Sequence, residues 1–312
     1  MTEAPAAPVP DPRREALRGH VAMLAFSALV AGSFSLGALV ANLIDPVSVT
    51  AVRFLWAAAV LAVFAALLAN RRDGGARGFR AADFRAPWRF VLLGALFAGY
   101  FVLMFEGLKT ADPVSAGAVF TLTPLMTAGF AWVWLGQRLD GWVAGALAIG
   151  AAGAVWVIFR ADWQALLGFQ VGRGEAIYFV GCILHAAFTP LLRRFNRGEP
   201  ALVATALVMG AGCVLLFALG WQGLRATDWA ALPALVWLTM AYLAIFASAL
   251  TFFLLQYAAQ RLPSSKVMAY TYLTPAWIVL WELGLGHGVP GMLLLPGIAL
   301  IVLALVMLLR RD

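Results

Sequence analysis

Ten long apolar stretches follow one another along the 312 residues of this chain, and they restrict it to one fold class. Each is close to the roughly 20 residues that an α-helix needs to cross a bilayer. Hydrophobic residues make up 63% of the chain and charged residues 12%, which no ordinary water-soluble domain matches. The sequence predicts an all-α integral membrane protein whose ten transmembrane helices lie near 20–43, 47–70, 90–108, 113–136, 141–160, 175–192, 201–220, 232–257, 264–286 and 290–309.

Lysine and arginine residues lie mainly on one side of these ten spans. Seventeen fall on the side that holds both chain ends and four on the other. Because cytoplasmic loops carry such an excess, we expect both termini in the cytoplasm, residues 1–19 as a disordered cytoplasmic tail, and a plasma-membrane location. The net charge of +7 is spread over many short loops, which argues against a nucleic-acid partner.

A short motif divides the chain into two similar halves. Leu122-Thr123-Pro124 returns 151 positions later as Leu273-Thr274-Pro275, each time inside an apolar span. Proline removes the donor for the carbonyl one turn earlier, at Phe120 and at Thr271, and in hydrocarbon that carbonyl must find another partner or line a wet cavity. Each half has an odd number of spans, so the halves enter the membrane from opposite sides. We predict two inverted five-helix repeats, 20–160 and 175–309, whose Leu-Thr-Pro helices meet near the bilayer midplane.

Several spans begin after an acidic residue that is followed by proline. This pair is typical of a helix cap with a pre-set first turn. The candidate caps are Asp45-Pro46, Asp112-Pro113 and Glu199-Pro200.

Short motifs in a fixed order give the chain a family resemblance. Their carriers are Asp45-Pro46, Val52-Arg53-Phe54, Gly107-Leu108-Lys109-Thr110, Leu122-Thr123-Pro124, Leu135-Gly136-Gln137-Arg138-Leu139, Gly145, Gln260-Arg261-Leu262, Tyr272-Leu273-Thr274-Pro275 and Gly297. With them the chain resembles the EamA-type transporters of the drug/metabolite transporter superfamily. The resemblance implies two EamA repeats, both termini inside, and a central cavity lined by spans 1, 3, 4, 6, 8 and 9. Family members mostly export amino acids or other small metabolites.

The chain departs from the family pattern at two positions. Where the family commonly has Leu-Gly-Glu at the ends of the fourth and ninth spans, this chain has Gly136-Gln137 and Gly286-His287. Any role that those glutamates have in other family members therefore cannot be assigned to this chain. Whether these positions carry a charge depends on the protonation of His287.

The ninth span is the most polar and supplies the first binding candidates. Lys266, Tyr270, Thr274, Trp277 and Trp281 form one helical stripe. The stripe is either a cavity wall or a surface for helix packing and interfacial anchoring. The expected substrate-binding set is Tyr270, Thr274, Trp277, Thr123, His185 and Tyr100.

His185 shares a helix face with Tyr178 and Cys182 in the sixth span. A lone histidine there is either a hydrogen-bonded packing residue or, in a cavity-lining span of this family, a ligand contact.

Three further ionisable residues lie at membrane depth: Arg53, Glu106 and Glu282. A charge in hydrocarbon costs at least about 2.5 kcal/mol, so such residues pair, face water or act in transport. We interpret them as an ion-pair set that forms a gate near the outer ends of their spans and could bind a zwitterion. The set could also carry protons, because burial favours the protonated form of a carboxyl group. The alternative is a static salt bridge, and for Arg53 a structural role is favoured.

The first functional hypothesis is a secondary transporter that exports amino acids or related metabolites by alternating access, and the alternative is a passive channel or facilitator. An intramembrane enzyme is not expected, because the three histidines are scattered and no paired aspartates occur. Primary active transport is not expected either, because the sequence has no phosphate-binding loop. No catalytic residue, metal or cofactor is predicted. The expected partners are a small-molecule substrate and the lipid bilayer, and a homodimer is left open.

Overall fold

The computed structural model describes residues 12–69, 79–138, 140–168, 170–259, 261–262, 264–288 and 291–310. Every regular element in these ranges is helical. The first half contains α1 (Pro12–Val40), α2 (Pro46–Ala69), η1 (Ala81–Phe84), α3 (Trp88–Leu108), α4 (Pro113–Phe120), α5 (Thr123–Leu135), α6 (Gly141–Ile158) and α7 (Trp163–Leu167). The second half contains α8 (Arg173–Phe195), α9 (Ala201–Leu219), α10 (Trp221–Ala226), α11 (Ala234–Ala244), η2 (Ile245–Leu250), α12 (Thr251–Ala259), α13 (Ser264–Ala269), η3 (Tyr270–Leu273), α14 (Thr274–Gly284), η4 (Met292–Leu294) and α15 (Leu295–Leu309).

Within the described ranges, nine helical stretches are long and apolar enough to cross a membrane. The tenth span is the broken stretch α13–η3–α14, which carries Lys266, Glu282 and several hydroxyl residues that lower its hydropathy. The expected all-α membrane fold is therefore confirmed, and the most polar predicted span is the one that departs furthest from a plain apolar helix.

Aspartate residues begin two of the spanning helices as expected. Asp112 accepts hydrogen bonds from two first-turn N–H groups of α4, at 2.8 and 3.4 Å. Asp45 accepts from the backbone N–H of Ser48 at 2.8 Å and so caps α2. Glu199 does not cap α9, contrary to expectation: its carboxylate instead accepts from Arg89 Nη2 at 2.9 Å.

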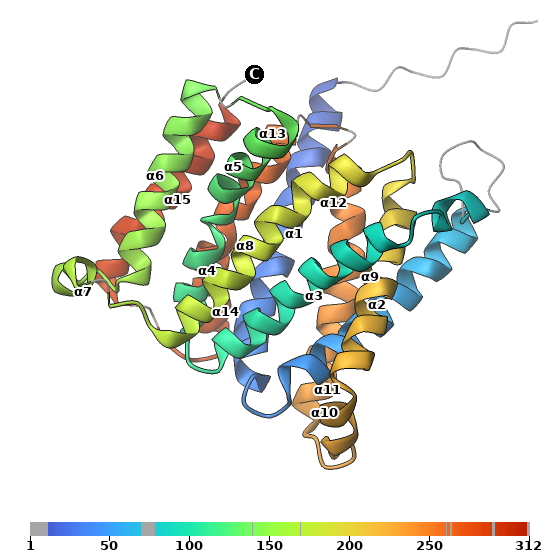
Figure 1. Cartoon of the computed structure of the whole chain (residues 1–312). Helices are drawn as coiled ribbons and strands as arrows, with labels where there is room; N and C mark the ends of the chain where they lie inside the picture. The colour runs from blue at the N-terminus through green and yellow to red at the C-terminus, as the bar shows by residue number, and fades with distance from the viewer. Residues whose placement is uncertain are drawn as a thin grey trace, which may run out of the picture.

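The helix contacts follow the pattern of an inverted repeat. Helices at matching positions in the two halves pack together: α2 with α9, α4 with α14, and α6 with α15 (Figure 1). Other contacts occur in matched pairs, since α3 against α8 has its counterpart in α1 against α12, and α5 against α8 in α1 against α14. Exchanging the two halves about a two-fold axis produces this arrangement.

Both Leu-Thr-Pro motifs interrupt their helices, but the carbonyl freed by the second motif accepts another hydrogen bond. The backbone N–H of Thr274 reaches the Thr271 carbonyl, because η3 tightens the turn before Pro275. The first break is tightened in the same way, with a bond of 3.1 Å from the Leu122 N–H to the Val119 carbonyl. The Thr271 carbonyl thus finds another partner, one of the two outcomes expected for it, because a local 3₁₀ turn replaces the donor that proline lacks.

The two interrupted spans meet, as predicted. A methyl group added at Gly117 of α4 would overlap the Ile278 side chain of α14 and lie 3.6 Å from Pro275 Cα. A larger residue at Gly117 would require Ile278 to move, in keeping with the small residues that membrane helices use at close crossings.

The start of α1 and the end of α15 lie at the same end of the bundle, at the top of Figure 1, and α10 lies at the opposite end. We call the first end the terminal face and the second the distal face.

Candidate functional site

An aromatic cluster joins the two repeats inside the bundle. We define the central aromatic cluster as Phe97 and Tyr100 of α3, Phe120 of α4, and His185 and Phe188 of α8. The His185 ring lies 4.6 Å from that of Tyr100 and 5.8 Å from that of Phe120, centroid to centroid. The Tyr100 hydroxyl is hydrogen-bonded to the Tyr178 hydroxyl at 3.0 Å. His185 Nδ1 is buried and has no hydrogen-bond partner.

Thr123 lies beside this cluster at the start of α5. Its hydroxyl is close to the Cys182 thiol of α8, without the geometry of a hydrogen bond. The structure therefore brings together three of the predicted binding residues: Tyr100, Thr123 and His185. A buried hydroxyl and a buried imidazole nitrogen without partners are costly unless another group satisfies them.

The other three predicted binding residues lie on the ninth span, and two of them contact α1. The Tyr270 hydroxyl lies 2.8 Å from His20 Nδ1, and Trp277 Nε1 donates to Ser27 Oγ at 3.0 Å. Thr274 is fully buried, and its hydroxyl has no partner. The polar atoms of Tyr270 and Trp277 are thus already used to hold α1, which agrees with the helix-packing interpretation.

The α1 helix connects this stripe to the central aromatic cluster. Phe34 lies two turns after Ser27, on the same face of α1. Its ring is 5.8 Å from Phe120 and 5.9 Å from Tyr178. The same face of α1 therefore contacts both Trp277 of the stripe and Phe120 of the central aromatic cluster.

Arg53 is buried between α2, α3 and the π-helical segment η2. Its Nε and Nη2 each lie 3.3 Å from Ser248 Oγ, and its guanidinium lies 3.8 Å above the centroid of the Phe101 ring. Nη1 has no hydrogen-bond partner. Ser248 Oγ in turn donates to the Leu243 carbonyl at 2.8 Å.

The predicted ion-pair set of Arg53, Glu106 and Glu282 does not form. Glu106 pairs with Lys109 at 2.6 Å, and Glu282 pairs with His287 at 2.7 Å. Among the residues that the structure describes, no carboxylate lies within ion-pair distance of Arg53. Each glutamate finds its partner close by in sequence, so neither needs the cation on α2.

A cavity of about 600 Å³ lies between the distal ends of the two interrupted spans, within the size range of small-molecule sites. It contains charges of both signs, with carboxylates from Asp112 and Glu282 and cations from Arg160 and, when protonated, His287. Glu282 Oε1 is buried and unpartnered. Among the residues that the structure describes, the lining is Asp112, Val114, Ser115, Val157, Arg160, Glu282, His287, Gly288, Gly291, Met292, Leu293 and Leu294.

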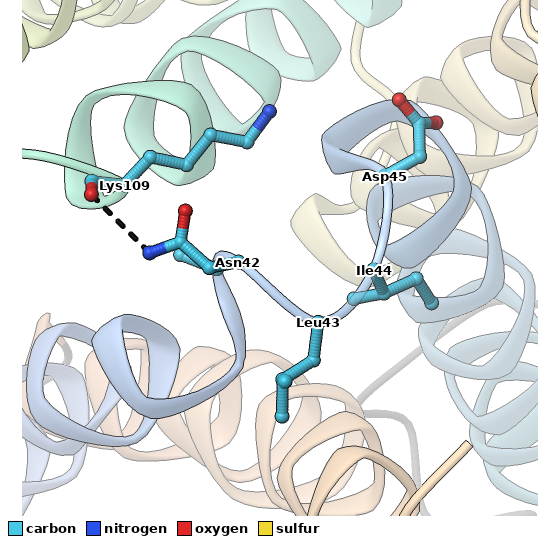
Figure 2. Close-up of a pocket in the computed structure, with 6 residues that line it drawn as sticks. Asn42, Leu43, Ile44, Asp45 and Lys109 are labelled. Carbon is cyan, nitrogen blue, oxygen red and sulfur yellow. Dashed lines mark hydrogen bonds between the residues drawn. The ribbon is translucent and has the colours of Figure 1, made fainter.

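A smaller hollow of about 400 Å³ lies where the α1–α2 connection meets the end of α3. Figure 2 shows the Asn42 amide reaching the Lys109 carbonyl, a hydrogen bond of 3.2 Å. The Asp45 carboxylate that lines it already caps α2. This hollow therefore offers a ligand few polar groups that are not already bonded.

Among the described residues, no group of three His, Cys, Asp or Glu side chains could hold a metal ion. Cys182 and Cys213 are buried free thiols.

The model of the EamA-like transporter family matches this chain twice, over residues 17–159 and 172–310. The chain belongs to the EamA-like transporter family. A relative in Bacillus subtilis, the uncharacterized transporter YyaM, is 24% identical over 86% of this chain and 86% of its own. The aromatic amino acid exporter YddG of Ancylobacter novellus is 33% identical over 64% of this chain and 67% of its own. One solved crystal structure, 23% identical, shares the fold with a TM-score of 0.65 over 95% of this chain and 96% of that chain.

Sequence reasoning missed three groups that the structure brings to these sites: Phe97 and Phe188 of the cluster, Ser248 beside Arg53, and Arg160 at the cavity. The two phenylalanines could have been found, since each lies three residues from a predicted binding residue and so on the same helix face. No sequence pattern indicated the π-helical turn that presents Ser248.

Proposed function

We propose that this protein is a secondary transporter that exports aromatic amino acids or closely related metabolites by alternating access between its two repeats. The observation that carries the proposal is the central aromatic cluster, which contains residues of both repeats and an unpartnered imidazole nitrogen at His185. Aromatic faces bind flat apolar rings, and a nearby nitrogen offers a hydrogen bond to a polar end. The similarity to an exporter of aromatic amino acids supports the same substrate class.

The two faces of the molecule support an alternating mechanism. At the terminal face, two ion pairs link the repeats: Arg89 with Glu199 at 2.9 Å, and Arg261 with Glu15 at 2.8 Å. At the distal face, the cavity of about 600 Å³ lies between α4 and α14. We interpret this arrangement as a state closed at the terminal face, in which the interrupted spans can shift against each other.

The terminal face is proposed to be cytoplasmic, in the plasma membrane, because it carries the seventeen-to-four excess of lysine and arginine. Protease should cleave the arginine-rich connection between α2 and α3 in inside-out vesicles and leave it intact in right-side-out vesicles. A tag after Asp312 that is reached only from outside the cell would reverse the assignment.

Counterflow in proteoliposomes tests the function. Vesicles preloaded with unlabelled phenylalanine should accumulate labelled phenylalanine, tyrosine or tryptophan transiently, because a carrier exchanges substrate faster than it returns empty. A passive channel or facilitator without a carrier cycle would give no such overshoot, and the absence of saturable uptake of all three would overturn the proposal.

Two matched variants test in the same assay whether the central aromatic cluster binds the substrate. Tyr100→Ala removes a ring from the central aromatic cluster and should raise KM. Phe253→Ala removes a ring of similar size from α12, where Phe253 is 61% exposed toward the surroundings of the bundle, and should leave KM unchanged. Loss of one aromatic contact predicts a change of about 1 kcal/mol, or roughly fivefold in KM.

A further inference from the structure

The Arg53 guanidinium is a buried cation with unused hydrogen-bonding capacity. Arg53 is 1% exposed, and its only described hydrogen bonds are two of 3.3 Å to a single acceptor, Ser248 Oγ. Nη1 has no partner. A guanidinium carries five N–H groups in a planar fork, so most of its donors are left without an acceptor.

Nothing described in the protein neutralises this charge. The buried or half-buried carboxylates on neighbouring spans are committed elsewhere, since Glu106 pairs with Lys109, Glu282 with His287, and Glu175 accepts from Ser115 Oγ at 2.9 Å. A cation at membrane depth is costly, and its contact with an aromatic face offsets only part of that cost. A planar anionic ligand is the partner that would satisfy the fork.

The position of Arg53 fits the proposed transport site. The guanidinium lies 3.8 Å from the Phe101 ring, and that ring is 4.6 Å from Tyr100 and 5.0 Å from Phe97, centroid to centroid. One aromatic ring therefore separates the cation from the central aromatic cluster. A solute with an aromatic ring at one end and a carboxylate at the other could contact both.

The acceptor that Arg53 now uses is held by irregular backbone. Ser248 lies in η2, the π-helical segment of its span, and its hydroxyl donates to the Leu243 carbonyl five residues earlier. Such π-turns within α-helices occur frequently at functional sites. The Ser248 hydroxyl is a neutral acceptor that two N–H groups of Arg53 share. A carboxylate would instead offer these N–H groups two oxygens that share a negative charge.

We infer that Arg53 binds the carboxylate of the transported solute and so selects amino acids over amines of the same shape. This inference rests on the proposed function, because it uses the same site and substrate class. It makes Arg53 a specificity-determining residue in addition to the helix-packing role that its burial gives it.

The test compares three ligands that differ only at the carboxylate: phenylalanine, phenylalaninamide and phenethylamine. Affinity is measured by ligand-induced thermal stabilisation of the purified full-length protein and by competition in counterflow. Wild-type protein should prefer phenylalanine, and Arg53→Gln should weaken phenylalanine binding about 10- to 100-fold while leaving the two amines nearly unchanged, as expected for a lost charged hydrogen bond. Ser248→Ala removes the present acceptor and should preserve the preference for the carboxylate.

A second variant keeps the test decisive if Arg53→Gln is unstable. Arg53→Lys retains the charge but loses the planar fork, so it should keep part of the carboxylate preference. If either folded variant loses affinity for all three ligands alike, or keeps the wild-type preference, Arg53 is purely structural and the inference is wrong. If wild-type protein binds none of the three, the proposed function itself fails, and this inference fails with it.

Discussion

Trp277 of α14 donates its indole N–H to the Ser27 hydroxyl of α1 across 3.0 Å. The Ser27 hydroxyl in turn donates to the Leu24 carbonyl at 2.9 Å. One turn further along α14, Trp281 donates to the carbonyl of Ala28, the residue after Ser27, at 3.1 Å. Because α1 and α14 belong to different repeats, these bonds fix the position of one repeat against the other.

Removing the Trp277–Ser27 bond should weaken this contact measurably but modestly. In a double-mutant cycle of Ser27→Ala with a Trp277 variant lacking the indole N–H, such as Trp277→Phe, we expect a coupling energy of about 0.6 kcal/mol, the average for polar contacts between membrane helices. The free energy of unfolding in detergent provides the measurement. Pairing Ser27→Ala with Trp132→Phe, whose ring is 63% exposed on α5, should give no coupling.

The crossing of α6 and α15 should tolerate no side chain at Gly153. A Cβ atom there would lie 2.5 Å from the Gly297 carbonyl oxygen and 3.0 Å from the side chains of Leu300 and Ile301. Gly153→Ala should therefore lower the free energy of unfolding by about 1–3 kcal/mol through overpacking. Gly145 lies on the same helix, and a methyl group added there would have nothing within 4 Å, so Gly145→Ala is the control and should be neutral or slightly stabilising. Equal effects of the two substitutions would contradict this account.

The sequence predicted the repeat and its breaks because both depend on local features. Proline interrupts a helix wherever it occurs, and an odd number of spans inverts the second half. The partners of ionisable residues were harder to predict, as Glu282 illustrates. Its partner His287 follows Gly286, whose φ of +80° turns the chain back toward the helix end, so that the His287 N–H also bonds to the Glu282 carbonyl at 3.0 Å.

Arg53 shows that the depth of a residue can be predicted from the sequence when its partner cannot. Its depth in α2 was readable from the sequence, which led to the expectation that an acid at the same level would pair with it. The partner is instead the hydroxyl of Ser248, which lies more than 190 residues further along the chain. A π-helical turn positions this hydroxyl, and no turn or proline signal in the sequence predicts that turn. Burial and depth can be predicted from hydropathy, whereas the choice of partner depends on how two distant helices are rotated.

The Arg89–Glu199 pair should stabilise the terminal face in a pH-dependent way. Burial alone would raise the pKa of the Glu199 carboxyl, but hydrogen bonds from the Arg197 N–H and from Arg89 lower its pKa below the usual value. A lowered pKa in the folded state contributes stability above the ordinary pKa of about 4.3, and this is lost as the pH falls through the lower folded value. Wild-type protein should therefore lose stability below about pH 4.

The variant Glu199→Gln isolates that contribution. It leaves the Arg89 guanidinium buried without its anion and should cost about 2 kcal/mol near neutral pH, less than a fully buried pair because Glu199 lies at an end of the bundle. Below the folded pKa of Glu199 the difference from wild type should shrink, since the wild-type carboxylate is then protonated too. A difference that is constant from pH 7 to pH 3, measured by thermal unfolding, would rule out the ionised pair as its source.

Glu282 is the better placed of the two membrane-depth acids to couple transport to protons. It is 9% exposed, its Oε1 faces no partner, and it lines the distal cavity, where Asp112 and Arg160 also lie. The Glu106 side chain is 39% exposed and held by Lys109 three residues later on the same helix, so the burial that coupling requires is missing there. If export is driven by proton entry, Glu282 should therefore be needed and Glu106 should not.

The expected outcome is a difference between two matched variants in proteoliposomes with an imposed pH gradient. For one coupled proton, each pH unit supplies about 1.4 kcal/mol, enough for at most a tenfold change in substrate accumulation. Acidifying the distal side should accelerate export by the parent protein and by Glu106→Gln. Glu282→Gln should lose that acceleration while keeping ligand-induced thermal stabilisation, because the carboxyl is proposed to carry the proton and leave the ring-binding cluster untouched. Normal pH-dependent export by Glu282→Gln, with lower stability alone, would mean that its bond to His287 is structural and that Glu282 does not carry the proton.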